Sequence, residues 1–267
     1  MKDSTRYNRA CSDMEEAKNR SDEILALVAE YAATLTGCGA YASRTARSAK
    51  RIAEAVGATA EIAMTHTSLI VSVECDGIIS TKVARIPQSP ISFERNADLC
   101  RLSWRAIDKK MPLGEIRSEF EAILAKPKID PVFVLFYVGF ANASFCRLFG
   151  GDFLAMAIVF TATLVGFSTK QYMLKKGVNN YLTIMASSFA ASICASVSLS
   201  FECTSQTALA TSPLFLIPGV PLINGVIDIL DGYTTTGMSR LAKEMLIIAC
   251  IGVGLFATLA LVKGQFL

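Results

Sequence analysis

The clearest chemical signal in the chain is a pair of polar side chains that follow a break in an apolar segment. Residues 214–232 read LFLIPGVPLINGVIDILDG, and Pro218 and Gly219 interrupt the apolar run. A proline cannot donate to the carbonyl four residues earlier and clashes with it, so a helix must open here. Asn224 and Asp228 are four residues apart and therefore project from one face of the helix that follows. The sequence predicts an amide and a carboxylate side by side, close to exposed helix backbone.

An opened helix within a membrane is suited to binding a polar ligand. Free backbone N–H and C=O groups are tolerated at that depth only where protein or a water-filled cavity receives them. The helix start after Pro221, which repeats the interruption, carries partial positive charge suited to a carboxylate. Asp228 would face the interior, where it could titrate, bind an ammonium group or pair with a base. The alternative is that the span has nearly ended, and that Asp228 pairs with Arg240 or caps the turn DGYTTTG.

Charge is distributed unevenly along the 267 residues. Residues 1–130 hold 19 of the 26 Lys and Arg and 18 of the 23 Asp and Glu, which leaves 12 charged residues for the remainder. Apolar runs near the length needed to cross about 30 Å of hydrocarbon recur in that remainder. They have almost no polar face at helical spacing, which disfavours an apolar soluble α-domain. We expect five transmembrane helices, the fourth discontinuous, over residues 131–149, 152–168, 181–200, 207–230 and 242–262.

The orientation of these spans follows from the basic residues in the short loops. The N-terminus, MKDSTRYNRACSDMEEAKNR, has charges throughout and no apolar core, so it is not a cleaved signal peptide. Basic residues gather after the second and fourth spans, whereas the other side has only Arg147 and Lys263. The positive-inside rule then predicts a multi-pass protein of the bacterial inner membrane, with a cytosolic N-terminus and an external C-terminus. The basic residues of the inner loops are Lys170, Lys175, Lys176, Arg240 and Lys243.

The N-terminal half reads as a cytosolic α+β domain over residues 1–130, with 1–20 disordered, followed by a five-span membrane domain over 131–267. Apolar positions at helical spacing predict a first helix from Asp22 to about Leu35. Asp76-Gly77 lies between two β-branched runs and predicts a hairpin, because glycine tolerates positive φ. Further helices are expected over 41–56, 92–109 and 113–125.

Little in this half indicates an enzyme. His66 is the only histidine, and no nucleophile or metal-binding motif surrounds it. The eight cysteines form no CxxC pair, so neither a zinc site nor a disulfide framework is supported, and a glycine-rich phosphate loop is absent. The net charge of +3 indicates no nucleic-acid partner. We expect no catalytic residues, metal or cofactor; the alternatives are a membrane-anchored hydrolase around His66 or Cys75, or a scaffold or sensor that transports nothing.

Small residues at four-residue spacing indicate close helix contacts in the apolar half. Gly139 and Ala143 have this spacing in the first span. The third span has two such rows, which predicts that it is surrounded by other helices. Five spans provide few neighbours, so we expect a partner chain or a homo-oligomer. The two rows are Ala186, Ala190 and Cys194, and Ser188, Ser192, Ser196 and Ser200.

Two charged residues near the start of the fifth span have the spacing of an ion pair. Glu244 lies one turn after Arg240, near the expected cytosolic face. An intrahelical or interhelical ion pair is the favoured interpretation of this spacing.

The stretch LIPGVPLINGVIDILDGYTTTGMSRLAKE resembles the signature of the threonine/serine exporter family. In that family a Pro-Gly break is followed by an Asn, an Asp four residues on, and a Gly-x-x-Arg before the last span of the first repeat. The N-terminal half is similar to the family through GCGAYASRTARSAKRIAEAVGA, SLIVSVECDGIISTKVARIP and ISFERNADLCRLSWRAI. The matching positions of the signature are Pro218, Gly219, Asn224, Asp228, Gly237 and Arg240.

The resemblance implies a secondary exporter. Long family members carry two five-span repeats, whereas this sequence contains one, which is similar to the larger subunit of the split members. Such a subunit works with a small membrane protein equivalent to the second repeat, and some split pairs are associated with succinate. The resemblance implies export of a carboxylate-bearing metabolite, threonine, serine or succinate, with Asp228 and Asn224 at the substrate or proton site. Coupling to protons through Asp228 is a further hypothesis, since no ATP-binding motif is present.

Overall fold

The computed structural model describes residues 2–65, 67–87, 89–127, 129–201 and 203–266. The chain divides into two compact units. The first unit comprises Met1–Pro127 and Val220–Leu241, and the second comprises Lys128–Gly219 and Ala242–Leu267. The sequence suggested a division at residues 130 and 131, whereas the contacts assign Val220–Leu241 to the first unit.

The first unit is an α+β fold around a three-stranded antiparallel sheet of order β1-β2-β3. Asp76 and Gly77 have φ of 52° and 76° and join β2 to β3, which confirms the expected hairpin. Helices α2, α3 and α4 begin and end within one residue of the expected bounds. The elements are α1 Lys2–Gly37, α2 Ala42–Ala55, β1 Thr59–Met64, β2 Ser68–Cys75, β3 Ile78–Arg85, α3 Phe93–Lys109 and α4 Leu113–Ala125.

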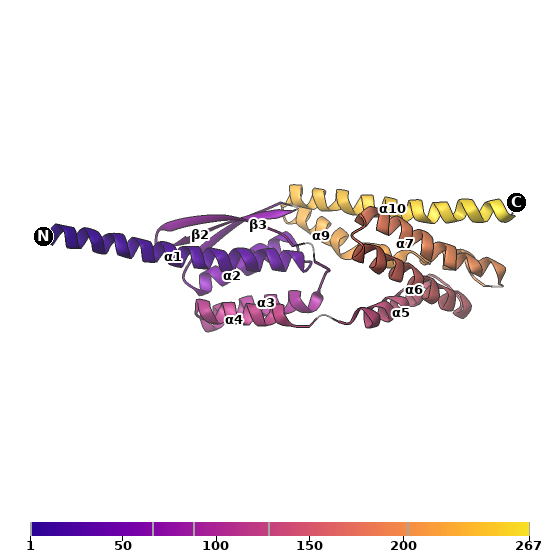
Figure 1. Ribbon diagram of the computed structural model, residues 1–267, viewed down its shortest axis with the longest axis horizontal. Helices are drawn as coiled ribbons and strands as arrows, with labels where there is room; N and C mark the ends of the chain where they lie inside the picture. The colour runs from indigo at the N-terminus through magenta and orange to yellow at the C-terminus, as the bar shows by residue number, and fades with distance from the viewer. Residues whose placement is uncertain (1, 66, 88, 128, 202, 267) are drawn as a thin grey trace. The chain divides into compact units, whose positions relative to one another are not determined.

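One face of the sheet packs on helices and forms the core of this unit. Leu69, Val71 and Val73 alternate along β2 and are fully buried, and α1 lies along the sheet (Figure 1). Tyr31 of α1 is also buried, and its hydroxyl donates to the carbonyl of Leu99 in α3 at 2.8 Å. The core therefore fixes α1 against both the sheet and α3.

Helix α1 differs from expectation at its start. It runs from Lys2 to Gly37, so it includes the first 20 residues, for which we expected disorder. These residues contain no proline or glycine, and their Glu, Ala and Lys residues favour helix, so the helix of the core continues toward the N-terminus.

The second unit is built from apolar helices. Helix α7 contacts α6 where a Cβ on Gly166 would lie 2.8 Å from Cβ of Ala191. It contacts α10 through Ser188, whose hydroxyl donates to the carbonyl of Ile251 at 2.8 Å. The predicted serine row thus contacts α10 through Ser188, whereas the contact with α6 is made by Ala191, which belongs to neither predicted row. The elements are α5 Pro131–Leu148, α6 Phe153–Lys175, α7 Asn180–Ala195, η1 Ser196–Ser200, α8 Ser205–Thr211, η2 Leu214–Leu216 and α10 Thr234–Phe266.

Four of the described helices are long and apolar enough to cross a membrane, or five if a broken pair counts as one span. The broken pair is Ser205–Leu216 with Gly219–Leu230, the latter being α9. The expected discontinuity lies at Ile217 and Pro218. Pro221 does not repeat it, contrary to expectation, because this proline lies in the first turn of α9, where a backbone N–H has no helical acceptor.

Candidate functional site

A tight turn between α9 and α10 brings Asp228 and Arg240 together. Gly232, with φ of 88°, ends α9. The N–H of Tyr233 donates to the carbonyl of Asp228 at 2.7 Å, and the N–H of Gly232 donates to that of Ile229 at 3.1 Å. These two bonds form a Schellman motif, which needs a residue such as glycine at the left-handed position. Helix α10 then begins at Thr234 and runs back beside α9.

Asp228 is fully buried, with one carboxylate oxygen hydrogen-bonded and the other in an ion pair. Its Oδ1 accepts from the backbone N–H of Ala42 at 2.6 Å, and its Oδ2 lies 3.3 Å from Nη1 of Arg240. Ala42 is the first residue of α2, and Tyr41 before it supplies no side-chain cap. Asp228 therefore caps α2 from 186 residues away, where the helix dipole favours a negative charge.

Arg240 and Asn224 bind the loop that joins α1 to α2. Both terminal nitrogens of Arg240 lie 3.5 Å from the carbonyl oxygen of Ala40, and Nδ2 of Asn224 donates to the carbonyl of Gly39 at 2.9 Å. The Arg240 side chain is 12% exposed. We call Asp228, Arg240, Asn224 and Ala42 the Asp228 site. The polar face of α9 predicted from the sequence, which carries Asn224 and Asp228, thus packs on this loop and on the start of α2.

Two further contacts of this hairpin were not predicted. The hydroxyl of Thr236 donates to the carbonyl of Met64 at the end of β1 at 2.9 Å, and that of Ser43 donates to Asp231. The three threonines in DGYTTTG were an available signal, since hydroxyls near a helix start often bind backbone.

Gly237 has a packing role at this site. A Cβ on Gly237 would lie 2.5 Å from the carbonyl oxygen of Gly225 and 2.6 Å from Cγ1 of Ile229. Helices α9 and α10 therefore cross so closely that only glycine fits at this position.

A cleft of about 340 Å³ lies beside the Asp228 site. We call it the Arg44 cleft. Asn224 belongs to both features, whereas Asp228 and Arg240 do not line the cleft. The lining residues are Gly39, Tyr41, Arg44, Phe93, Asn96, Ala97, Cys100, Val220, Asn224 and Ile227.

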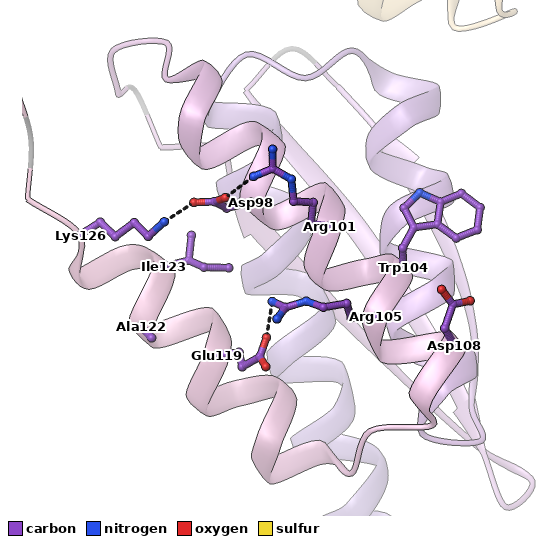
Figure 2. Close-up of a pocket in the computed structure, with 9 residues that line it drawn as sticks. All are labelled: Asp98, Arg101, Trp104, Arg105, Asp108, Glu119, Ala122, Ile123 and Lys126. Atoms are coloured by element: carbon purple, nitrogen blue, oxygen red, sulfur yellow. Dashed lines mark hydrogen bonds and ion pairs between the residues drawn. The ribbon is translucent and has the colours of Figure 1, made fainter.

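A larger cleft of about 710 Å³ lies between α3 and α4 (Figure 2). Five of its six charged side chains form ion pairs: Lys126 and Arg101 contact Asp98, and Arg105 contacts Glu119. The Arg105–Glu119 pair joins α3 to α4, and the Lys126–Asp98 pair joins α3 to the residue after α4, which indicates a structural role.

The remaining predicted residues lie in α10, at the break before α9 or outside the described residues. Pro218 and Gly219 form the break before α9. Glu244 is buried one turn after Arg240 on α10. His66 lies outside the described residues. Among the described residues, no group of three His, Cys, Asp or Glu side chains is arranged to hold a metal.

The sequence matches a family model described as "Putative threonine/serine exporter" over residues 26–262. The chain belongs to the threonine/serine exporter family. This confirms the resemblance carried by the Pro-Gly break, Asn224, Asp228 and the Gly-x-x-Arg motif. Three of the four residues of the Asp228 site in this exporter-family chain, Asn224, Asp228 and Arg240, belong to that signature.

The exporter-family chain is also similar to two curated proteins. It is 25% identical to "Probable succinate transporter subunit YjjP" of Klebsiella aerogenes over 258 residues, 94% of this chain and 99% of that protein. It is 30% identical to the protein of the same name from Escherichia coli over 136 residues, 49% of this chain and 53% of that protein. No solved structure matches it. The exporter-family chain is a subunit of a transporter, not an enzyme, and a multi-pass inner-membrane protein.

Proposed function

We propose that this chain is the larger subunit of a two-chain secondary exporter that moves a small carboxylate-bearing metabolite out of the cell. The observation that carries the proposal is the buried Asp228–Arg240 pair bound to the start of α2, directly after the break in the apolar segment. The printed names of the two relatives make succinate the first substrate to test. Threonine and serine, from the family description, are the second.

The groups that contact the Asp228 carboxylate are also suited to a substrate carboxylate. The N–H of Ala42 and the guanidinium of Arg240 are the two groups that bind it. Helix starts and arginines bind carboxylates of any origin. We infer that a substrate carboxylate competes with Asp228 for these groups, and that the contact of α9 with the α1–α2 loop opens as it does so.

Protonation of Asp228 would favour this opening. A neutral carboxyl pairs weakly with Arg240, so a proton arriving at Asp228 frees the guanidinium for an anionic substrate. In this scheme export is coupled to proton movement through Asp228. Export by the assembled pair should then slow when the pH gradient is dissipated, and an unchanged rate would reject the coupling.

A partner chain is supported by the word subunit in both relatives' names. We propose a small membrane protein equivalent to the second repeat, with the pair able to form higher oligomers in the bilayer. The basic loops favour a cytosolic N-terminus and an external C-terminus.

Substrate identity is tested by counterflow in liposomes. The chain is co-purified with its small partner and reconstituted, and uptake of labelled succinate, threonine and serine is measured side by side against an excess of each unlabelled compound. We expect succinate to exchange fastest. Exchange of none of the three would contradict the proposal, and exchange of the amino acids alone would move the substrate to them.

A further inference from the structure

The Arg44 cleft has the size and charge of a site for a small carboxylate. Ligand sites in proteins enclose about 300–1,000 Å³, so this cleft, at about 340 Å³, fits only a small metabolite. All its lining residues belong to the first unit. Among them Arg44 is the one charged side chain, and an anion is therefore favoured.

Two buried amides give the cleft polar groups suited to carboxylate oxygens. Asn96 and Asn224 are each 7% exposed. Asn96 Oδ1 accepts from the Cys100 thiol at 3.6 Å, and no protein acceptor for its Nδ2 group is found among the described residues. This amide can therefore donate to a ligand or to water in the cleft.

Arg44 is held at the cleft by an aromatic ring. Its guanidinium carbon lies 4.7 Å from the centroid of the Tyr41 ring, which restrains an otherwise exposed side chain. Phe93, Val220 and Ile227 supply apolar wall suited to methylene groups. The combination of one cation, amide donors and apolar wall fits a short aliphatic carboxylate.

The cleft offers little for an ammonium group. No lining residue is an Asp or Glu, and the Gly39 carbonyl already accepts from Asn224. We propose that the Arg44 cleft binds a small aliphatic mono- or dicarboxylate and discriminates against the zwitterionic amino acids threonine and serine. Arg44 and Asn96 bind the carboxylate, and α9 forms one wall, so that occupancy of the cleft is sensed by the helix that carries Asp228. This last step rests on the proposed function, whereas binding does not.

Binding is tested on the purified full-length chain in detergent. Labelled succinate is titrated by scintillation proximity, with unlabelled succinate, threonine, serine and sulfate as competitors. We expect Arg44→Gln and Asn96→Leu each to weaken succinate binding about tenfold or more, because each removes a charge-assisted or buried hydrogen bond. Arg47→Gln is the matched control, since Arg47 is exposed on the same helix and does not line the cleft.

The outcomes separate this inference from the proposed function. Competition by unlabelled succinate but not by threonine, serine or sulfate supports the carboxylate site in the Arg44 cleft, provided that Arg47→Gln binds succinate as the wild type does. Wild-type affinity in Arg44→Gln overturns it, and so does absence of succinate binding or equal competition by threonine. Arg44 is exposed, so its variant should fold even if Asn96→Leu does not. Binding that persists in a pair inactive in counterflow would reject the proposed function and leave the cleft assignment standing.

Discussion

At the scale of residues, the Asp228–Arg240 pair is the most consequential contact in the first unit. A buried charge is costly unless it is paired, and removing one partner of such a pair typically costs about 3–5 kcal/mol. We expect Arg240→Gln to lower the unfolding temperature of the detergent-solubilised chain markedly, because it removes the cation that faces the buried Asp228 carboxylate.

The double variant Asp228→Asn with Arg240→Gln is the control for this prediction. The double variant no longer has a buried Asp228 carboxylate without its cation, so its unfolding temperature should lie closer to that of the wild type than that of Arg240→Gln does. Equal loss in the single and double variants would contradict the pairing.

A second ion pair in the first unit gives a prediction about pH. The Lys126 ammonium, 2.5 Å from Oδ2 of Asp98, holds the pKa of that carboxyl below its usual value, and Arg101 adds to the effect. A pKa lowered by folding means that the stabilisation is present above about pH 4 and is lost as pH falls through the folded-state pKa.

We therefore expect acid to destabilise the wild type more than Asp98→Asn, measured as unfolding temperature between pH 6 and pH 3. The asparagine variant serves as the reference because every other carboxyl titrates in both proteins. Parallel pH profiles would show that the contact seen in Figure 2 adds nothing to stability.

At the scale of elements, the crossing of α9 and α10 depends on Gly237. A methyl group there would meet the backbone carbonyl of Gly225 at 2.5 Å, and backbone cannot move away cheaply. We expect Gly237→Ala to destabilise the chain by about 1–3 kcal/mol, as overpacking does. Gly252→Ala on the same helix meets no described atom within 4 Å and should be neutral or slightly stabilising. Similar losses in both variants would contradict the close crossing.

The two prolines around α9 make a second matched pair. Pro218 precedes α9 at the break, whereas Pro221 lies in its first turn. We expect Pro218→Ala to reduce export by the assembled pair, because the helix can then continue through the break, and Pro221→Ala to retain it. If export fell only in Pro221→Ala, Pro221 and not Pro218 would be the proline that transport requires.

Local signals predicted most of these elements. The Asp76-Gly77 turn and the Pro-Gly break each lie within the few residues that they organise. Strand β1 was not separated from β2: its burial alternates regularly, but Ala60 and Ala63 are alanines, which are uncommon in strands.

Contacts between distant segments could not be predicted from one sequence. Nothing near Asp228 indicates that its partner is the N–H of Ala42, because a backbone group leaves no mark in the sequence. Asn142 was missed as well, although a lone amide in an apolar helix was an available signal. Its Nδ2 donates to Thr163 at 2.7 Å and to the carbonyls of Thr211 and Ser212 at 3.2 Å, joining α5 to α6 and the end of α8.

At the scale of the whole molecule, the proposed orientation places the N-terminus in the cytosol and the C-terminus on the opposite face of the membrane. Single cysteines introduced near each end of a variant lacking the native cysteines should differ in labelling by an impermeant maleimide on intact cells. We expect labelling at the C-terminal position alone. The positive-inside rule places the basic loops and the N-terminus in the cytosol, where an impermeant reagent does not reach. Labelling of both ends, or of the N-terminal position alone, would contradict the orientation.

The central claim is that the Asp228 carboxylate takes part in moving substrate, beyond its structural pairing with Arg240. Its most direct test is counterflow of labelled succinate by the co-purified pair carrying Asp228→Asn, compared with the wild type at equal amounts of assembled protein in the liposomes. Asparagine keeps the shape of the side chain and can still accept from Ala42, and comparison at equal assembled protein separates loss of transport from loss of stability. We predict at least a tenfold loss of exchange; exchange at the wild-type rate would show that Asp228 has no part in transport.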